Sequence, residues 1–328
     1  MPTPPISVCM PVYDAEAFVD RAIASIRAQS FADFEFVIVD DGSRDATAAI
    51  VERHQAEDPR LRLIRTAHAG IVAASNAALA AARGRYVARM DGDDTATPER
   101  LALSFDFLER HPEIGVVGGA AAITDSSGRI VHVVRPPLAA DAVARSHLVR
   151  NTTINPTTLA RRDLLVALGG YRKAFEWAED TDLWLRVLDR AAMANLPEIL
   201  VHVRRHSGEI SFRHSEAQAV ASAAARAAAA LRRRGLPDPV GDAPALTDEH
   251  FARLGLSPGA RHRAVVERLL QMMRLALSCN DPDQGWSMLQ RIQATASPAE
   301  YLAGLREFSE WMASRADPPA APDGYGTS

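Results

Sequence analysis

Three short acidic clusters are candidates for chemistry: Asp40-Asp41, Asp91-Gly92-Asp93-Asp94 and Glu179-Asp180. The second cluster sets three carboxylates around one glycine, and like charges this close repel one another strongly unless they share a cation. Hard divalent cations take oxygen ligands, and Mg²⁺ typically binds one or two carboxylates together with substrate phosphates. The second cluster therefore indicates a divalent metal site, with a solvated acidic loop as the simpler alternative.

The other two clusters indicate contacts with a substrate. The carboxylate of Asp40 could accept a hydrogen bond from a uracil N–H, and a capped turn after a strand is the ordinary alternative. A carboxylate of Glu179 or Asp180 could act as a general base that deprotonates a sugar hydroxyl as the hydroxyl attacks. The alternative for this cluster is capping of a helix start by Glu179 or Asp182, because the helix dipole favours acids there.

A fourth polar segment, Pro11-Val12-Tyr13-Asp14, follows a short apolar run. The proline ends that run, and Tyr13 could stack on a base or a ribose. The alternative is an ordinary strand-to-helix turn in which Asp14 caps the helix. All four polar segments fall at the ends of predicted strands or in loops that could face them, and ligands of open parallel sheets bind at the carboxyl ends of strands.

The elements that would position these segments alternate between strand and helix over the first hundred residues. The β-α-β-α order predicts a parallel, doubly wound sheet flanked by helices. Apolar runs predict strands at 6–12, 34–39, 61–65 and 86–90, and helical spacing predicts helices at 18–26, from about 46, and at 71–82.

Later segments continue the α/β pattern less regularly. Thr97-Pro98-Glu99 predicts a helix start, with the Thr97 hydroxyl as N-cap and proline at the first position. The short runs 116–117 and 130–134 predict a hairpin around a turn at 125–128. Helices are predicted at 161–168 and 180–191, and a final strand at 200–204.

The chain changes character from about residue 215. Alanine-, leucine- and arginine-rich stretches predict helices at 216–234, 260–278, 283–295 and 298–314. The end is rich in Pro, Gly and Ala, which predicts disorder. We therefore predict an α/β catalytic domain at 1–214, an α-helical C-terminal region at 215–316 and a disordered tail at 317–328.

Composition limits the classes of function. Of the 328 residues, 47% are hydrophobic and 24% charged, with a net charge of -4, so no basic field attracts nucleic acid. Cys9 and Cys279 form neither a disulfide framework nor a zinc pattern. The sequence shows no signal-peptide pattern and no apolar run of about 18 residues, so we expect a cytoplasmic protein. Arg226 and Arg232–Arg234 could contact anionic lipid at the inner membrane surface, although a solvated helix face is the simpler interpretation.

Together these segments resemble the family 2 inverting glycosyltransferases, which have the GT-A fold. The resemblance spans roughly residues 5–214. Each motif is weak by itself, but the order and spacing of the motifs are specific to this family. The motifs are Ile6–Tyr13, Ile38–Ser43, Gly70, Asn76, Ala82–Tyr86, Met90–Asp94, Gly169–Tyr171, Glu179-Asp180, Asp182–Arg186 and Arg204–Ser207.

The resemblance implies transfer of a sugar from a UDP-, dTDP- or GDP-linked donor to a hydroxyl of a glycan, a lipid-linked saccharide, a protein or a small molecule, with inversion. Asp93 would bind Mg²⁺ or Mn²⁺, and His206 would lie near the metal or diphosphate unless it is a lone surface histidine. Asp180 would be the general base, with Glu179 the less favoured choice. Nucleotide-sugar contacts would come from Pro11, Val12, Tyr13, Glu16, Asp40, Gly70, Asn76, Met90, Asp91 and Gly92.

One departure and several alternatives stay open. Asn155-Pro156 stands where many members of the family have His-Pro, although asparagine can still hydrogen-bond an acceptor sugar. A nucleotidyltransferase also pairs such a sheet with metal carboxylates, but no glycine- and arginine-rich phosphate loop follows the first strand. A non-catalytic sugar-nucleotide-binding or scaffold protein is the third alternative. The C-terminal helices could pack on one another, form a homo-oligomer interface or cap the acceptor side.

Overall fold

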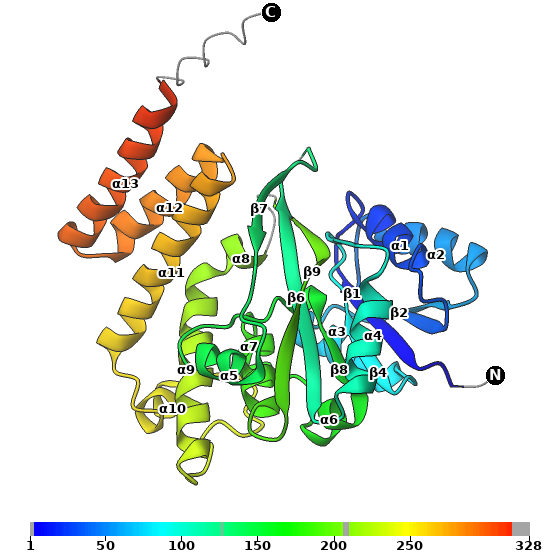
Figure 1. Ribbon diagram of the computed structural model, residues 1–328. Helices are drawn as coiled ribbons and strands as arrows, with labels where there is room; N and C mark the ends of the chain where they lie inside the picture. The colour runs from blue at the N-terminus through cyan, green and yellow to red at the C-terminus, as the bar shows by residue number, and fades with distance from the viewer. Residues whose placement is uncertain (1–2, 126, 206–209, 317–328) are drawn as a thin grey trace, which may run out of the picture.

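The computed structural model describes residues 3–125, 127–205 and 210–316, and its centre is a nine-stranded sheet (Figure 1). The strand order is β3-β2-β1-β4-β8-β6-β9-β5, with β7 paired to β6. The strands are β1 Ile6–Val12, β2 Phe34–Asp40, β3 Leu61–Arg65, β4 Tyr86–Arg89, β5 Thr95–Ala96, β6 Ile114–Thr124, β7 Ile130–Val134, β8 Leu159–Arg161 and β9 Ala192–Arg204.

The first four strands confirm the predicted parallel β-α-β-α unit. β1 pairs in parallel with β2 and β4, and β2 with β3. The second half of the sheet is mixed, because β8 runs antiparallel to both β4 and β6 while β6 and β9 are parallel. The helices and 3₁₀ turns of the sheet domain are α1 Val19–Arg27, α2 Thr47–Glu57, α3 Ile71–Ala81, α4 Arg100–Arg110, α5 Ala140–His147, η1 Asn155–Thr157, α6 Arg162–Ala167, η2 Lys173–Phe175 and α7 Glu179–Val187.

Helices cover both faces of the sheet, so β1 and β2 are buried throughout. Alternate residues of β1 point to opposite faces: Ile6 and Val8 pack with α1, α2 and α4, whereas Cys9 packs with α3 and α7. Each buried aliphatic side chain contributes roughly 1.5–3 kcal/mol. Cys9 is a buried free thiol.

The largest differences from prediction concern β6, β8 and β9. β6 and β9 are much longer than the runs that predicted them, and β8 begins before the predicted helix at 161–168. β6 is rich in glycine and alanine, which have low strand propensity, so packing decides its conformation. A Cβ added at Gly119 would lie 2.5 Å from Cδ1 of Leu200, which shows how closely β9 approaches.

The predicted helix start at Thr97 is wrong in one respect. α4 begins at Arg100 with Glu99 at the N-cap position. The Thr97 hydroxyl instead donates to the carbonyl oxygens of Ile199 and Leu200, at 3.0 and 3.1 Å. The hydroxyl therefore fastens the chain to β9, a long-range contact that local spacing does not reveal.

The C-terminal part is helical, as predicted, and α9 connects it to the sheet domain (Figure 1). One side of α9 packs its alanines on Phe175 and Leu185 of the sheet domain, and Ala219 joins a second cluster built by α11, α12 and α13. The helices are α8 Ile210–Arg213, α9 Ser215–Arg233, α10 Asp248–Arg253, α11 Pro258–Ser278, α12 Pro282–Thr295 and α13 Pro298–Ala316.

Two predictions lie outside the described residues: the role of His206 and the disorder of the tail at 317–328. Within the described ranges, none of the helices combines the length and apolarity that crossing a bilayer requires.

Candidate active site

The polar segments that follow β1, β2 and β4 meet at one edge of the sheet. In the parallel register, Val12 is opposite Asp40, and Cys9 is opposite Arg89. The backbone N–H of Met90 donates to the Cys9 carbonyl at 3.0 Å, which continues the pairing towards Asp91. Because these strands are neighbours and parallel, the three polar segments converge at their carboxyl ends, where ligands of such sheets bind.

Tyr13 forms an aromatic platform at this edge. Its side chain is 38% exposed, and its ring stacks on His68, with ring centroids 4.1 Å apart. His68 is held by an Nδ1 contact of 2.8 Å with Oδ2 of Asp41. His68 could not be predicted from the sequence, because its position beside Tyr13 depends on the path of the β3–α3 loop.

The two acids that end β2 both organise backbone. Asp41 is buried and accepts hydrogen bonds from the N–H groups of Ala69 and Gly70, at 3.0 and 2.9 Å. Asp40 accepts from the N–H of Ser43 at 3.2 Å, which is the capped turn considered above. This turn leaves Asp40 at the sheet edge beside Val12, where the predicted nucleoside contact would lie.

Glu16 and Asp14 bind the first strand-to-helix loop to the second. Oδ1 of Asp14 accepts from the N–H of Arg44 at 2.8 Å, and Oε2 of Glu16 accepts from the N–H of Ala46 at 2.9 Å. The suggestion that Asp14 caps α1 is wrong, because Phe18 occupies the N-cap position. The two loops are therefore one cross-linked unit beside Tyr13.

Three predicted contact residues shape the backbone around the site. Gly70 has φ +92°, and a Cβ there would lie 2.5 Å from Oε1 of Glu176. A Cβ on Gly92 would lie 2.8 Å from Cγ1 of Val12. The amide of Asn76 exchanges two hydrogen bonds, at 2.8 and 2.9 Å, with the backbone of Tyr171. These residues hold the segments close together, and the structure gives Asn76 a bracing role that spacing did not predict.

Arg89 is the buried cation at the centre of the acidic site. It is 7% exposed, and its Nη2 donates to Oδ1 of Asp91 at 2.6 Å. Burial raises the pKa of Asp91; the Arg89 charge lowers it, and repulsion from Asp93 raises it. Arg100 lies fully buried behind this loop, with Nη1 3.2 Å from Sδ of Met90. The sequence signal for Arg89 is an arginine within an apolar strand, directly before a cluster of acids.

Asp91 and Asp93 carry carboxylate oxygens, the type of ligand that a hard cation takes. Burial is the main cause of the raised pKa of Asp91, and repulsion from Asp93 adds to it; a shared cation would relieve that repulsion. Asp94 differs: it is buried, and its Oδ1 accepts from the N–H of Arg204 at 3.0 Å, which ties the loop to β9. Among the described residues, no three or more His, Cys, Asp or Glu side chains are grouped as a metal site.

Glu179 and Asp180 start α7 and face the same centre. Burial, and then repulsion from Asp180, raise the pKa of Glu179 to about 8. The pKa of Asp180 is also raised, by burial first and by Asp91, against hydrogen bonds from Thr181 and the attraction of Arg89. Two acidic clusters almost ninety residues apart in sequence therefore influence each other's protonation around Arg89.

Asp180 is held in a defined orientation. Its Oδ2 accepts a hydrogen bond from Nδ2 of Asn151 at 2.9 Å, and its Oδ1 accepts from the N–H of Thr181 at 2.6 Å. Asn151 was not identified from the sequence. The nearby Asn155 lies in η1, and its Oδ1 is buried with no hydrogen-bond partner among the described residues.

The helix-capping alternative for Asp182 is wrong. Asp182 is completely buried, and its Oδ2 accepts from Nε of Arg172 at 3.0 Å and from Nε of Arg186 at 2.9 Å. A buried carboxylate that loses such partners strongly destabilises the fold. Asp182 and its two arginines therefore have a structural role: they hold α7 in place.

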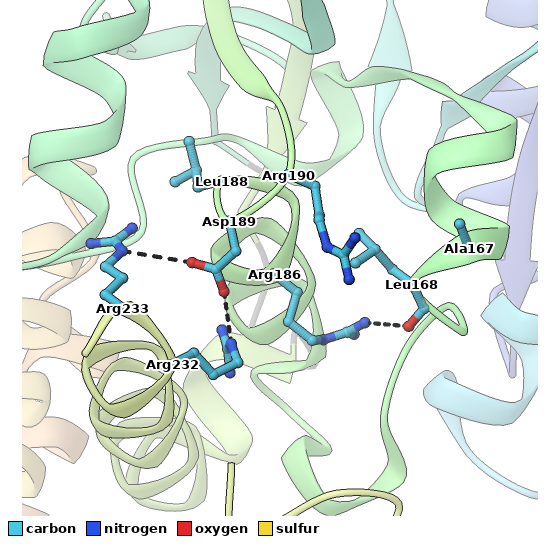
Figure 2. Close-up of a pocket in the computed structure, with 8 residues that line it drawn as sticks. All are labelled: Ala167, Leu168, Arg186, Leu188, Asp189, Arg190, Arg232 and Arg233. Carbon is cyan, nitrogen blue, oxygen red and sulfur yellow. Dashed lines mark hydrogen bonds and ion pairs between the residues drawn. The ribbon is translucent and has the colours of Figure 1, made fainter. Parts of the chain in front are cut away.

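A surface cavity of about 620 Å³ lies at the other end of α7, away from these acids (Figure 2). Figure 2 shows Asp189 between Arg232 and Arg233, with an Arg232 contact of 2.7 Å, and Arg186 donating to the Leu168 carbonyl at 2.7 Å. Arg232 thus neutralises the charge of Asp189, and Arg186 binds a carbonyl at the C-terminus of α6, where the helix dipole favours cations. The cavity contains none of the acidic clusters and is not the candidate active site.

The fold is shared with glycosyltransferases of the GT-A type. A mannosyltransferase from Pyrobaculum calidifontis, solved with GDP-Man and Mn²⁺, superposes with a TM-score of 0.55 at 19% identity, over 96% of this chain and 85% of that one. S. aureus TarS 1-349, solved with UDP-GlcNAc, gives a TM-score of 0.53 at 21% identity, over 86% and 88% of the two chains. These likenesses confirm the predicted GT-A fold.

The sequence relatives define the family more narrowly. The model of Glycosyl transferase family 2 matches residues 7–168. The putative glycosyltransferase EpsE of Bacillus subtilis is 34% identical over 211 residues, which cover 62% of this chain and 74% of that protein. This chain belongs to glycosyltransferase family 2, and it is a glycosyltransferase.

Proposed function

We propose that this enzyme transfers a sugar from a nucleoside-diphosphate sugar to a hydroxyl group, with a divalent cation and with inversion. One observation carries the proposal: Asp91 follows β4 and Glu179 and Asp180 begin α7, yet the charges of Asp91 and Arg89 both act on the pKa of Glu179 and of Asp180. Such shifts concentrate where charged substrates bind and protons move.

The donor would lie across the carboxyl ends of β1, β2 and β4. Tyr13, stacked on His68, offers a partly exposed ring for the base or ribose, and Asp40 lies opposite the preceding residue, Val12. The structurally similar TarS and mannosyltransferase were solved with UDP-GlcNAc and GDP-Man, which supports a donor of this class. Pro11, Val12, Glu16, Gly70, Asn76, Met90 and Gly92 complete or brace the proposed donor site.

Asp93, with Asp91 beside it, would hold Mg²⁺ or Mn²⁺. When bound, such a cation neutralises charge that develops on the departing diphosphate. The mannosyltransferase was solved with Mn²⁺, which supports a divalent cation in this fold. The protein's own contribution is the Arg89 guanidinium, which keeps Asp91 in place at 2.6 Å.

Asp180 would act as the general base. Its carboxylate takes the proton of the acceptor hydroxyl, the hydroxyl oxygen bonds to the anomeric carbon, and the bond from that carbon to the diphosphate oxygen breaks. A single displacement of this kind inverts the anomeric centre. Glu179 suits the role less well, because a pKa of about 8 keeps it largely protonated at neutral pH.

A thermal-shift screen tests the proposal against its rivals. Nucleotide sugars and nucleoside triphosphates are compared with and without Mn²⁺. Selective stabilisation by one nucleotide sugar, increasing with its concentration and with Mn²⁺, is expected. Stabilisation by triphosphates alone would favour a nucleotidyltransferase. Binding of a nucleotide sugar without any turnover would favour a scaffold protein.

A further inference from the structure

The loop before Glu179-Asp180 contains a strained aromatic residue. Trp177 has φ +74°, a left-handed conformation that bulky side chains rarely adopt. Such conformations cost on the order of 1–3 kcal/mol and persist only where the surrounding structure imposes them. Trp177 precedes Asp180 by three residues, so the strain lies directly beside the proposed general base.

Trp177 forms a flat aromatic pair with His214, the residue before α9. The two ring centroids are 3.7 Å apart and the planes differ by 3°. Burial lowers the pKa of His214, and the neighbouring Arg213 lowers it further, so the imidazole is neutral at pH 7. The indole remains partly exposed, and its N–H donates to no residue in the part of the chain that the structure describes.

The C-terminal helices hold this aromatic pair in place. Nε2 of Gln218 in α9 donates to the Trp177 carbonyl at 3.0 Å, and Arg268 of α11 donates to Oε1 of the same glutamine. Arg291 of α12 donates to Oε1 of Glu216 at 2.8 Å and to the Phe212 carbonyl at 2.6 Å. These contacts fix the start of α9, where His214 lies, so α11 and α12 brace both rings.

The same loop also reaches the proposed donor side. Nζ of Lys173 donates to the Ala69 carbonyl at 3.2 Å and to Oε1 of Glu176 at 2.6 Å, next to Gly70. Residues 173–180 therefore run from the loop before α3, past Trp177, to Asp180. Because Trp177 stacks on the residue before α9 and is hydrogen-bonded to Gln218, a ligand on its ring would lie next to the C-terminal helices.

We propose that Trp177, stacked on His214, is an acceptor subsite that takes a pyranose ring, so that the acceptor is a saccharide. The C–H face of a pyranose packs on an aromatic ring, and its hydroxyls accept from an indole N–H, a combination of apolar surface and polar edge that tryptophan supplies. This inference rests on the proposed function, and it gives the C-terminal helices a role in the reaction.

The test separates acceptor use from donor use. Release of nucleoside diphosphate is measured with water alone and with a panel of methyl pyranosides, using the donor that the thermal-shift screen identifies. Wild type is compared with Trp177→Ala, Trp177→Phe and a control, Trp286→Ala, which removes a 45% exposed tryptophan from α12. Donor affinity and circular dichroism show whether each variant is folded.

At least one methyl pyranoside is expected to accelerate release by wild type. Trp177→Ala should lose about tenfold or more of that acceleration, with donor Kd and the rate in water within about twofold of wild type. Trp177→Phe should retain most of it, and Trp286→Ala all of it. As a readout that needs no turnover, methyl pyranosides should quench tryptophan fluorescence in wild type but not in Trp177→Phe.

Three results would overturn the inference while leaving the proposed function intact. They are Trp177→Ala behaving like Trp286→Ala, no response of wild type to any pyranoside, and acceleration only by other hydroxyl compounds such as glycerol or a serine peptide. A wild-type enzyme that binds no nucleotide sugar at all would instead refute the proposed function, and the acceptor subsite with it.

Discussion

Asn151 donates a hydrogen bond from Nδ2 to Oδ2 of Asp180 at 2.9 Å, which joins the loop after α5 to the start of α7. A hydrogen bond to the ionised form of a carboxyl lowers its pKa. Here that bond opposes the burial and the Asp91 repulsion that raise the pKa of Asp180. The hydrogen bond from Asn151 therefore favours the ionised form of the proposed base.

Replacing Asn151 should move the pH dependence of the reaction. A base must be deprotonated to act, so a higher pKa of Asp180 shifts the acid limb of the kcat/KM profile to higher pH. Asn151→Ala should shift the limb by roughly one unit, and Asn151→Asp by more, because it adds a like charge. Val149→Ala, at a 75% exposed position of the same loop, should leave the profile unchanged. If the acid limb lay at the same pH in all four proteins, the role of Asp180 as the base oriented by Asn151 would be contradicted.

Glu179 should make the free energy of unfolding depend on pH. Its pKa in the folded protein, about 8, lies above the ordinary value of 4.5, so the folded state binds more protons between these limits. Stability is therefore lost as pH rises from about 4.5 to about 8. Glu179→Gln removes this loss. At pH 8 its free energy of unfolding, measured by denaturant melts, should exceed that of wild type by on the order of 1–3 kcal/mol. A difference that does not vary from pH 5 to pH 8 would count against the raised pKa.

Arg89 should be required for stability in the absence of metal. Arg89→Met leaves Asp91, Glu179 and Asp180 without their buried cation, which should cost about 3–5 kcal/mol. Mn²⁺ supplies positive charge at the same centre, so it should raise the Tm of Arg89→Met more than that of wild type. The control is Arg65→Ala, which breaks an exposed ion pair with Glu52 worth about 0–1 kcal/mol. Equal Mn²⁺ effects on all three proteins would argue against a shared centre.

Replacing Trp177 by glycine should not destabilise the protein more than replacing it by alanine. At φ +74°, alanine retains the steric conflict of a Cβ, whereas glycine does not. Trp177→Gly should therefore be at least as stable as Trp177→Ala, by up to about 1 kcal/mol, although glycine normally lowers stability through chain entropy. Denaturant melts of the two variants check this; a markedly less stable glycine variant would show that the backbone is not strained.

The N-terminal half of the fold was accessible from the sequence because its strands are short β-branched runs, as in Phe34–Asp40. β6 was underestimated because its glycines and alanines carry little local signal, and β9 because its full length comes from pairing with β6. β8 was missed because three residues between turns show no periodicity.

The site shows the same division. The convergence of the Asp40 and Asp91 segments follows from neighbouring parallel strands whose carboxyl ends share an edge, which spacing alone can predict. Asp180 begins α7 and follows no strand, so its place beside Asp91 comes from the folded arrangement. Arg89 and Asn151 act through contacts that link distant parts of the chain, so only the folded arrangement reveals them.

The most direct test of the central claim is Asp180→Asn, assayed for nucleoside diphosphate release in parallel with donor affinity. The amide keeps the size of the side chain and cannot accept the proton. Turnover should fall by about 10²–10⁴-fold, while the donor Kd stays within about twofold of wild type in the presence of Mn²⁺. Turnover close to wild type would contradict the account, because the acid that converges with Asp91 and Asp93 would then not be the base.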